Sequence, residues 1–500
     1  VTGVQTCALP IFTYTIDGAP LVGKIPGKEN AFCIIGLRAG LGEGGGHGWL
    51  LAQQIVHGEA CYDTWCLDPR RFTSHANVEM TSLKAIEDYQ NEFRFHFPHE
   101  HRPAARPAKT TSLTPIMEQE NAEFTVINGW ERVEYIKPSK DFHPSLSFHF
   151  DEAFDIVADE VKNVQNNVGL TEVNGFNRFE ITGSDANSFI DRMFCGNVTH
   201  KTGRVGLGYL LNEFGMIKSE ATISNIPSSD RGPKRIWYGS AAASEFHDMD
   251  WLKQHLEDDE DVDIKSLTNN YTILLLAGPK SRDVLSKCSR VDWSKKSFPW
   301  LSVRECFIGF SPATVMSVSF SGELAYEVHV PNESLYAAYL ALTEAGEEFG
   351  MKLFGSRAVE SMRMEKGFLG WKSDLITEFD PFETGLDRFV NLKKDNFIGK
   401  VALKNRIKKN AKQKLVCLKV ACKHAPAYGG ASLMEDGKVV GTITSGEWGH
   451  RVNLNLAYAF VNIDKSKEGT QMHLDLLGEL VSVEVIPFGP YDESFSRILA

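Results

Sequence analysis

The sequence lacks the features that mark membrane-spanning, disulfide-rich or nucleic-acid-binding proteins. Its longest largely apolar run, Tyr271–Ala277, is far shorter than the roughly 18 residues that a membrane-spanning helix needs. Nine cysteines in 500 residues, an odd number, do not suggest a disulfide scaffold and indicate a reducing compartment. The formal net charge of −12 provides no overall positive field to attract polyanions. We therefore expect no membrane insertion and no nucleic-acid partner.

The remaining composition is that of a folded, multidomain protein. Hydrophobic residues make up 42% and charged residues 24% of the chain, which supplies material for several cores. At roughly 100 to 200 residues per domain, the length predicts about three or four domains.

The first eleven residues, VTGVQTCALPI, resemble the translation of a sequencing adapter rather than a targeting signal. They have no basic n-region and no small-residue cleavage site, which disfavours a signal peptide. We expect residues 1–11 to be an artefact, native sequence to begin near Phe12, and the true N-terminus to be missing.

A glycine-rich segment follows the first strand-like stretch, Phe32–Leu37. It precedes a helical stretch, Trp49–Val56, and contains a match to G-x-G-x-x-G, but no acidic ribose ligand follows about 20 residues on. We therefore reject a dinucleotide fingerprint. Glycines in such a turn still allow a ligand close to the backbone and orient a helix N-terminus towards an anion, although an ordinary tight turn is the alternative. The cofactor-binding candidates are Gly44, Gly45, Gly46 and Gly48.

Residues 73–145 are rich in aromatic residues, proline and histidine, and we predict an irregular connecting region. His96, His99 and His101 are close in sequence, but no nearby cysteine or second histidine pair completes a zinc site. We assign no metal and expect packed or surface histidines.

The middle of the chain mixes helical and strand patterns, which predicts an α+β fold rather than a doubly wound sheet. Asp185 is a candidate N-cap for the helix through Met193, and Asn212–Gly215 is a candidate turn. Predicted helices are Asp151–Asn167 and Ser334–Phe349; predicted strands are Phe179–Thr182, Val205–Leu211, Ala221–Ile226 and Arg235–Tyr238.

The simplest interpretation of two runs of charged residues is that both are solvent-exposed segments. The acidic run Glu257–Asp263 reads as a loop, and the basic run Lys404–Lys414 as an interdomain linker. Beyond the linker, turn residues separate four predicted strands, which indicates a small β-barrel or sandwich. These strands are Leu415–Ala421, Lys438–Thr444, Leu456–Val461 and Leu480–Ile486.

Motifs along the chain resemble those of the dimethylglycine and sarcosine dehydrogenase family, which joins an FAD-dependent oxidoreductase to a folate-binding aminomethyltransferase-like domain. The motifs are Thr15–Gly23 (TIDGAPLVG), Gly44–Gly48 (GGGHG), Leu67–Phe72 (LDPRRF), Phe97–Lys109 (FPHEHRPAARPAK), Gly129–Arg132 (GWER), Ile181–Ala186 (ITGSDA), Ser321–Glu327 (SGELAYE), Gly355–Gly367 (GSRAVESMRMEKG), Phe397–Leu403 (FIGKVAL) and Gly441–Glu447 (GTITSGE).

The resemblance implies a domain order. Residues 12–72 are expected to be the end of an amine-oxidase-type FAD domain, 73–145 a connecting domain, 146–400 the folate-binding domain and 401–500 its C-terminal β-barrel. The family's N-terminal FAD segment is absent from this chain, so we expect a fragment that is inactive in oxidation.

The resemblance also implies the reaction. In this family FAD oxidises a small N-methylated amine to an iminium, which tetrahydrofolate captures as methylenetetrahydrofolate. FAD and tetrahydrofolate are therefore the expected cofactors, with an electron acceptor that the sequence does not identify. The expected compartment is the cytoplasm in a bacterium or the mitochondrial matrix in a eukaryote.

Glu220 is the expected catalytic residue, because it matches a family acid, often aspartate, in the strand after a glycine turn. Capture of an iminium at a folate nitrogen requires a nearby anion to stabilise positive charge and handle a proton. An exposed strand residue without a catalytic role is the alternative.

Four further residues match family positions for folate binding. Glu327 would accept pteridine N–H groups, and Arg357 would pair with the folate carboxylate. The alternatives are a surface carboxylate for Glu327 and a structural ion pair, with Glu360 or another acid, for Arg357. Trp237 would line the pteridine pocket or simply fill a core, and Tyr491 would lie near folate.

Two other functions remain open from the sequence. One is a stand-alone aminomethyltransferase, which the flavin-like segment before residue 72 disfavours. The other is a non-catalytic regulatory subunit, since the family includes a phosphatase regulatory protein of the same architecture. Phe320 departs from relatives with tyrosine there, so no hydroxyl acts at that position.

Overall fold

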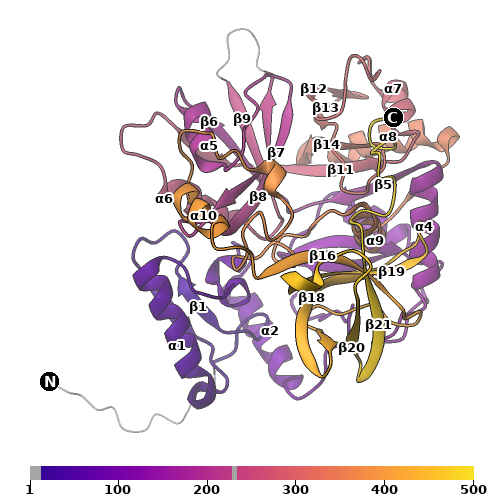
Figure 1. The fold of residues 1–500 in the computed structure, drawn as a ribbon. Helices are drawn as coiled ribbons and strands as arrows, with labels where there is room; N and C mark the ends of the chain where they lie inside the picture. Colours follow the sequence, from indigo (N-terminus) through magenta and orange to yellow (C-terminus); the bar gives the residue numbers. More distant parts are fainter. Residues whose placement is uncertain (1–12, 228–233) are drawn as a thin grey trace.

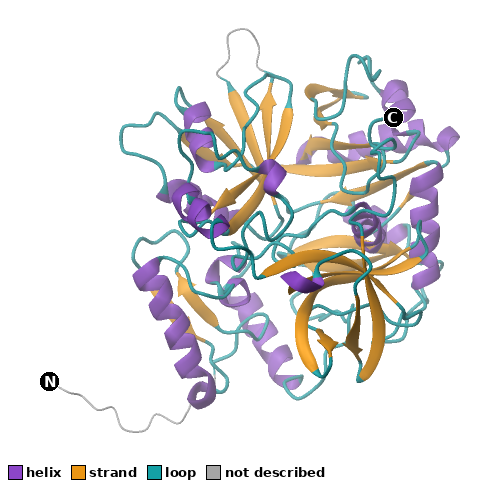
Figure 2. Cartoon of the chain, viewed as in Figure 1, coloured by secondary structure: helices purple, strands orange, loops and turns teal. Residues whose placement is uncertain are grey.

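Two antiparallel-rich sheets, a closed barrel and a helical N-terminal lobe make up the structure, a computed structural model that describes residues 13–227 and 234–500 (Figure 1). The interpretation of residues 1–11 as an adapter lies outside this range. Helices and strands are mixed throughout, which confirms the predicted α+β class (Figure 2). Among the described helices, none is long and apolar enough to cross a membrane.

The N-terminal lobe packs two helices beside a two-stranded antiparallel sheet. Asn77 caps its second helix, because its side chain accepts a hydrogen bond from the Met80 amide at 2.8 Å. The elements are β1 (Leu21–Lys24), β2 (Phe32–Ile35), α1 (Gly40–His57), η1 (Trp65–Leu67), η2 (Pro69–Arg71) and α2 (Val78–Gln90).

The prediction for the start of the first helix was wrong. Helix α1 begins at Gly40 rather than Trp49, so Gly44, Gly45, Gly46 and Gly48 lie inside the helix and not in a turn before it. Glycine lowers helix stability but remains sterically compatible with it, and no proline interrupts the hydrogen-bond ladder here.

The connecting region is also more regular than predicted. Helix α2 and three shorter elements occupy the part of the chain that we expected to be irregular. Helix α2 was missed although its apolar residues recur at helical spacing, as at Leu83 and Ile86, and it buries only Met80 and Glu87. The shorter elements are α3 (Thr114–Gln119), β3 (Ala122–Ile127) and β4 (Trp130–Ile136).

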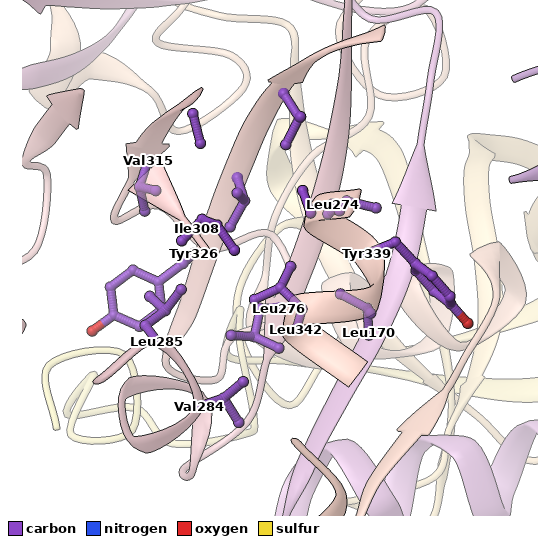
Figure 3. Packing of buried hydrophobic residues seen from close by; sticks show 14 of the residues in the cluster. Leu170, Leu274, Leu276, Val284, Leu285, Ile308, Val315, Tyr326, Tyr339 and Leu342 are labelled. Atoms are coloured by element: carbon purple, nitrogen blue, oxygen red, sulfur yellow. The ribbon is translucent and has the colours of Figure 1, made fainter. Parts of the chain in front are cut away.

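A six-stranded sheet, in the order β12-β13-β14-β11-β5-β15, forms the largest core. Helices cover both faces of this sheet, and successive side chains along a strand pack against one layer of helices and then the other. Leu274 and Leu276 of β11 pack in the cluster with α7 and α8 (Figure 3). Leu275 and Ala277 pack with α4 and α9 on the other face. The elements are α4 (Phe154–Asn166), β5 (Val168–Val173), β11 (Tyr271–Ala277), α7 (Ser281–Cys288), β12 (Val303–Ile308), β13 (Ser311–Met316), β14 (Ala325–Pro331), η3 (Asn332–Ser334), α8 (Leu335–Gly346), η4 (Glu347–Phe349), β15 (Met351–Leu353) and α9 (Ser356–Lys366).

A five-stranded antiparallel sheet, in the order β10-β6-β9-β8-β7, has helices on one face. Ala221 and Ile223 of β8 pack with Phe189 of α5 and Trp251 of α6. The predicted N-cap position of Asp185 is confirmed, but its side chain accepts the Asp261 amide instead of capping the helix. The elements are β6 (Asn177–Thr182), α5 (Ala186–Met193), β7 (Val205–Leu211), β8 (Ile217–Ile226), β9 (Arg235–Ser240), α6 (Glu245–Gln254) and β10 (Asp263–Ser266).

The C-terminal strands close a six-stranded barrel, which decides between the two architectures predicted for this segment. Two short strands, β17 and β20, were missed. Part of the basic run before the barrel is helical, since Lys404 and Arg406 lie in α10. The elements are η5 (Asp387–Phe389), α10 (Lys400–Ile407), β16 (Gln413–Val420), β17 (Ser432–Glu435), β18 (Lys438–Gly449), β19 (Leu454–Asn462), η6 (Ile463–Lys465), β20 (Gln471–Leu476) and β21 (Glu479–Ile486).

A buried ion network joins the barrel to the six-stranded sheet. Arg451, at the β18–β19 turn, pairs with Glu365 of α9 and, at 2.7 Å, with Glu323 before β14. All three side chains are at most 1% exposed. Arg497, near the C-terminus, also donates to Glu323 at 2.7 Å. The network thus compensates two buried carboxylates with cations from distant parts of the chain.

We expect Arg451→Met to lower the free energy of unfolding by about 3–5 kcal/mol, because it leaves Glu365 buried without its cation. Urea unfolding followed by fluorescence measures the loss. The matched control is Lys287→Met, which breaks an exposed pair with Glu348 and should cost under about 1 kcal/mol. Equal losses in the two variants would contradict the role given to burial.

Candidate functional site

Glu220 lies on β8, on the opposite face of the five-stranded sheet from helices α5 and α6. The preceding turn is fixed by Asn212, whose side chain accepts the amides of Phe214 and Met216 at 3.1 and 3.0 Å. Gly215 completes it at φ +78°, where a Cβ would meet the Leu403 backbone at 2.7 Å. This hairpin sets the register in which Tyr209 of β7 lies directly across from Glu220.

The Glu220 carboxyl is largely enclosed and has no cationic partner among the described residues. Burial raises its pKa to about 7, while a hydrogen bond from Tyr209 opposes that shift. Tyr209 is 3% exposed, and burial with the adjacent carboxylate raises its own pKa well above the usual value. Near neutral pH the Glu220 carboxyl is therefore present in both its protonated and its ionised form, which suits a group that transfers protons.

Glu327 and Trp237 lie together on the inner side of the two sheets. The Glu327 carboxylate contacts Nε2 of His329 at 3.0 Å, and the ring of His329 lies 5.9 Å from that of Trp237. The indole of Trp237, itself 2% exposed, donates to Glu180 at 3.2 Å. The Glu327 side chain remains 33% exposed. It is thus accessible and lies beside an aromatic wall.

The same cluster contains Arg178, which the sequence reasoning missed. Its guanidinium lies 5.3 Å from the Trp237 ring and contacts His329. Burial and the Arg178 charge lower the pKa of His329 to about 4, so this histidine is neutral at pH 7. The feature that points to Arg178 is its position between Asn177 and Phe179, which are both buried. Charged residues are rarely fully buried without a partner, so an arginine at such a position is a candidate for a functional role.

Glu220 and Trp237 face the same side of the sheet. Trp237 pairs with Ser224, which follows Glu220 by four residues on β8. Side chains alternate along a strand, so Glu220 and Ser224 share a face, about 13 Å apart at roughly 3.3 Å per residue. A ligand that contacts both Glu220 and the Glu327 cluster would therefore extend along β8.

Arg357 is already paired. It lies at the start of α9, where its guanidinium makes two hydrogen bonds to the Asp151 carboxylate, at 2.9 and 3.0 Å. Both side chains are nearly buried, at 12% and 11% exposed. In the described part of the chain, no hydrogen bond or ion pair joins Arg357 to Glu220 or Glu327. Asp151 takes two of the five guanidinium N–H donors of Arg357, so a ligand carboxylate would share this arginine with Asp151.

Tyr491 belongs to the buried ion network. Its hydroxyl donates to Glu323 at 2.7 Å, and the Arg451 guanidinium lies 3.8 Å from its ring centroid. Glu323 precedes Glu327 by four residues, so this segment connects Tyr491 to the candidate site. Phe320 stacks on Phe368 with ring centroids 5.9 Å apart.

The glycines of α1 leave their surroundings open. A Cβ at Gly44, Gly45, Gly46 or Gly48 would meet no atom within 4 Å. Consecutive helical residues point about 100° apart, so these glycines leave the α1 backbone uncovered on more than one side, where a bound group could approach it.

The histidines of the connecting region bind a carboxylate. His99 Nδ1 and His101 Nε2 contact the two oxygens of Glu134 at 2.7 and 2.6 Å, and these hydrogen bonds outweigh burial to lower the pKa of Glu134 to about 2. His96 lies beside Arg102 instead. Across residues 13–227 and 234–500, no group of three or more His, Cys, Asp or Glu residues is arranged to hold a metal ion.

Segment 59–72 of the N-terminal lobe attaches to the same strand as Glu220. Glu59 pairs with Lys218 of β8, two residues before Glu220, and Asp63 pairs with Lys372 at 2.7 Å. Trp65 packs edge-on against Trp371 at 4.9 Å, and the Trp371 indole donates to the Lys218 carbonyl at 3.3 Å. The lobe is thus anchored next to the candidate site.

Three known domain families match the chain. Residues 57–111 match the FAD dependent oxidoreductase central domain, 113–394 the GCVT N-terminal domain and 413–492 the glycine cleavage T-protein C-terminal barrel domain. The candidate residues Glu220, Trp237, Glu327 and Arg357 all fall within the GCVT N-terminal domain.

Curated relatives extend well beyond the matched region. Human mitochondrial dimethylglycine dehydrogenase is 33% identical over 470 residues, which cover 93% of this chain and 54% of the relative. Mouse mitochondrial sarcosine dehydrogenase is 26% identical, covering 99% and 59%. The mouse mitochondrial pyruvate dehydrogenase phosphatase regulatory subunit is 26% identical, covering 96% and 55%. The chain spans about half the length of these relatives.

A solved structure shows the same fold. Glycine cleavage system aminomethyltransferase T from Bartonella henselae superposes with a TM-score of 0.66 at 20% identity, covering 77% of this chain and 98% of that one.

We expect Glu220→Gln to stabilise the protein more at pH 8 than at pH 4.5. The folded-state pKa of Glu220, about 7, lies above the usual value, so the unfolded chain loses this proton first and the wild type loses stability as pH rises between those values. Glutamine does not titrate. Urea unfolding should show the difference between variant and wild type growing by about 2–3 kcal/mol. A difference that is the same at both pH values would rule out the raised pKa.

Proposed function

Because the chain belongs to the glycine-cleavage T-protein family and carries the central domain of an FAD-dependent oxidoreductase, we propose that it is the one-carbon-transfer part of a flavin-dependent N-methylamine dehydrogenase. The substrate class is a small N-methylated amine of the dimethylglycine or sarcosine type. Tetrahydrofolate is the one-carbon acceptor, and methylenetetrahydrofolate is the product. If the source is a eukaryote, the mitochondrial names of the mammalian relatives support the mitochondrial matrix as its location.

One observation carries the proposal: a buried carboxyl without a cation, Glu220, lies two residues from the point where the flavin-side segment attaches. The Glu59–Lys218 pair and the packing of Trp65 on Trp371 bring the two parts together at β8. The flavin-side segment also contacts α6, through Trp65 on His247 and Arg70 with Asp250, so an iminium formed on the flavin side would have to pass to the other face of the sheet to reach this carboxyl. There it would meet an acid that can accept or release a proton and stabilise positive charge.

Glu327 supplies the second recognition element. It is accessible, so its carboxylate can accept N–H groups of a flat heterocycle bound next to His329, whose ring contacts the buried Trp237. Glu220 then acts at the reacting nitrogens, and Glu327 orients the acceptor. This division of roles gives each acid a separate measurable effect.

The exposed apolar side chains of the N-terminal lobe support the proposal that the chain belongs to a longer protein with a flavin-binding half. Isolated proteins rarely expose so many large apolar side chains together, and such a face normally contacts another protein region. FAD, when bound there, would supply the two-electron oxidation of the amine, and the open glycine face of α1 would lie against it. The exposed side chains are Leu41, Trp49, Ile55, Val56, Leu83, Ile86, Tyr89, Phe93 and Phe95.

We expect Glu220→Gln, in the longer protein, to lower methylenetetrahydrofolate formation by about 10²-fold, the scale of one acid–base or electrostatic contact. Amine oxidation should stay nearly unchanged, with formaldehyde released instead. Stopped-flow flavin reduction and product chromatography separate the two steps. The matched variant Glu327→Gln should weaken binding of 5-formyltetrahydrofolate. A wild-type product yield in Glu220→Gln together with loss of product in Glu327→Gln would reverse the two roles.

We expect the 500-residue chain alone to purify without a stoichiometric flavin spectrum, because α1 and its open face are only one side of a binding site. In the longer protein the amides of α1 should exchange at least about tenfold more slowly, since a covered helix opens less often. Hydrogen exchange read by mass spectrometry tests both proteins, with α9 as the internal control. Stoichiometric flavin on the short chain would contradict the proposed division.

A further inference from the structure

Arg178 is a buried cation that no carboxylate compensates directly. Its side chain belongs to a residue only 3% exposed, and no Asp or Glu in residues 13–227 and 234–500 lies within ion-pair distance of it. Two other buried arginines, Arg363 and Arg451, each pair with two carboxylates. Burial lowers the pKa of Arg178 to about 10, so it still carries its charge near pH 7. A buried charge without an acid beside it is costly, which indicates a role beyond packing.

The contact with Arg178 determines where His329 carries its proton. An arginine side chain has only donors, so its guanidinium donates to Nδ1 of His329, which must be the unprotonated ring nitrogen. The histidine is 4% exposed and neutral at pH 7, because burial and the Arg178 charge lower its pKa to about 4. Its single ring proton therefore lies on Nε2.

This proton faces Glu327. Nε2 of His329 lies 3.0 Å from Oε2 of Glu327, and the two residues are two positions apart on β14, so their side chains share a face of the sheet. In the part of the chain that the structure describes, no lysine or arginine pairs with Glu327, and no hydrogen bond reaches its other oxygen, Oε1. The Glu327 side chain is 33% exposed, so Oε1 is available to a ligand.

We propose that Arg178 and His329 are positioning residues that form a relay with Glu327. Arg178 fixes the tautomer of His329, and His329 holds Oε2 of Glu327 so that Oε1 receives N–H groups of the one-carbon acceptor. The inference rests on the proposed function, in which Glu327 binds that acceptor. Each group donates to the next, from guanidinium to imidazole and from imidazole to carboxylate. The opposite tautomer would direct two donors at each other and turn a ring lone pair towards the carboxylate.

NMR of the full 500-residue chain labelled with [¹⁵N]histidine measures the tautomer at pH 7. The His329 signals, assigned by their loss in His329→Gln, should be those of the Nε2–H form. Arg178→Met has similar length without the charge and should give the Nδ1–H form or a mixture, whereas Arg178→Lys keeps a donor and should restore the wild-type form. The matched control is Arg192→Met, which removes a pair with Glu260 on α5 and should change nothing at His329.

Calorimetric titration with 5-formyltetrahydrofolate measures the consequence for binding. Arg178→Met and His329→Leu should each weaken binding about tenfold, the scale of one charge-assisted contact. His329→Gln should lose less than His329→Leu, because the glutamine oxygen can accept from Arg178 while its NH₂ group donates to Glu327. Arg192→Met should bind like the wild type. Thermal melting of each variant shows whether the compared proteins are equally folded.

The outcomes separate the two proposals. An Nδ1–H tautomer in the wild type, or a tautomer that Arg178→Met leaves unchanged, overturns the relay. Wild-type affinity in His329→Leu, or equal losses in His329→Leu and His329→Gln, overturns the positioning role, and this comparison decides it even if Arg178→Met does not fold. Failure of the wild type to bind 5-formyltetrahydrofolate overturns the proposed function and the part of the relay in recognition, while the tautomer still decides whether the relay exists.

Discussion

Alternation of side chains along the strands is the constraint on which the rest of the structure depends. On β8, Ala221 and Ile223 pack against α5 and α6, so Glu220 and Ser224 must face the interior between the sheets. On β11, Leu274 and Leu275 likewise divide between two helical layers. A shift of one residue would bury Glu220 in an apolar core and expose the residues that hold the helices.

The candidate site contains two acids in contrasting surroundings. Glu220 has only the Tyr209 hydroxyl to compensate its burial, whereas Glu327 is partly exposed beside the neutral His329 and the cation Arg178. The raised pKa of Glu220 suits proton transfer, whereas the partly exposed carboxylate of Glu327 suits recognition of N–H groups.

Charge pairing elsewhere serves to hold the domains together. Arg451 and Arg497 compensate Glu323 and Glu365 where the barrel meets the six-stranded sheet, and Asp63 with Lys372 attaches the N-terminal lobe. Arg357 belongs to this structural group through Asp151.

The sequence by itself determined the features that depend on local pattern. The local pattern predicted the Asn212–Gly215 turn and the strand Ala221–Ile226, and the family resemblance placed Glu220 in a strand after that turn. The ordered motifs identified the family that the domain matches then confirmed. Helix α1 was misjudged at its start because glycine propensity is a weak local term that other interactions override. Only the tertiary structure decided the partners of the charged residues. Asp151 and Arg357 are 206 positions apart, and Arg178 and His329 are 151 apart. An ion pair requires approach to within about 4 Å, which the folded chain sets and sequence spacing does not.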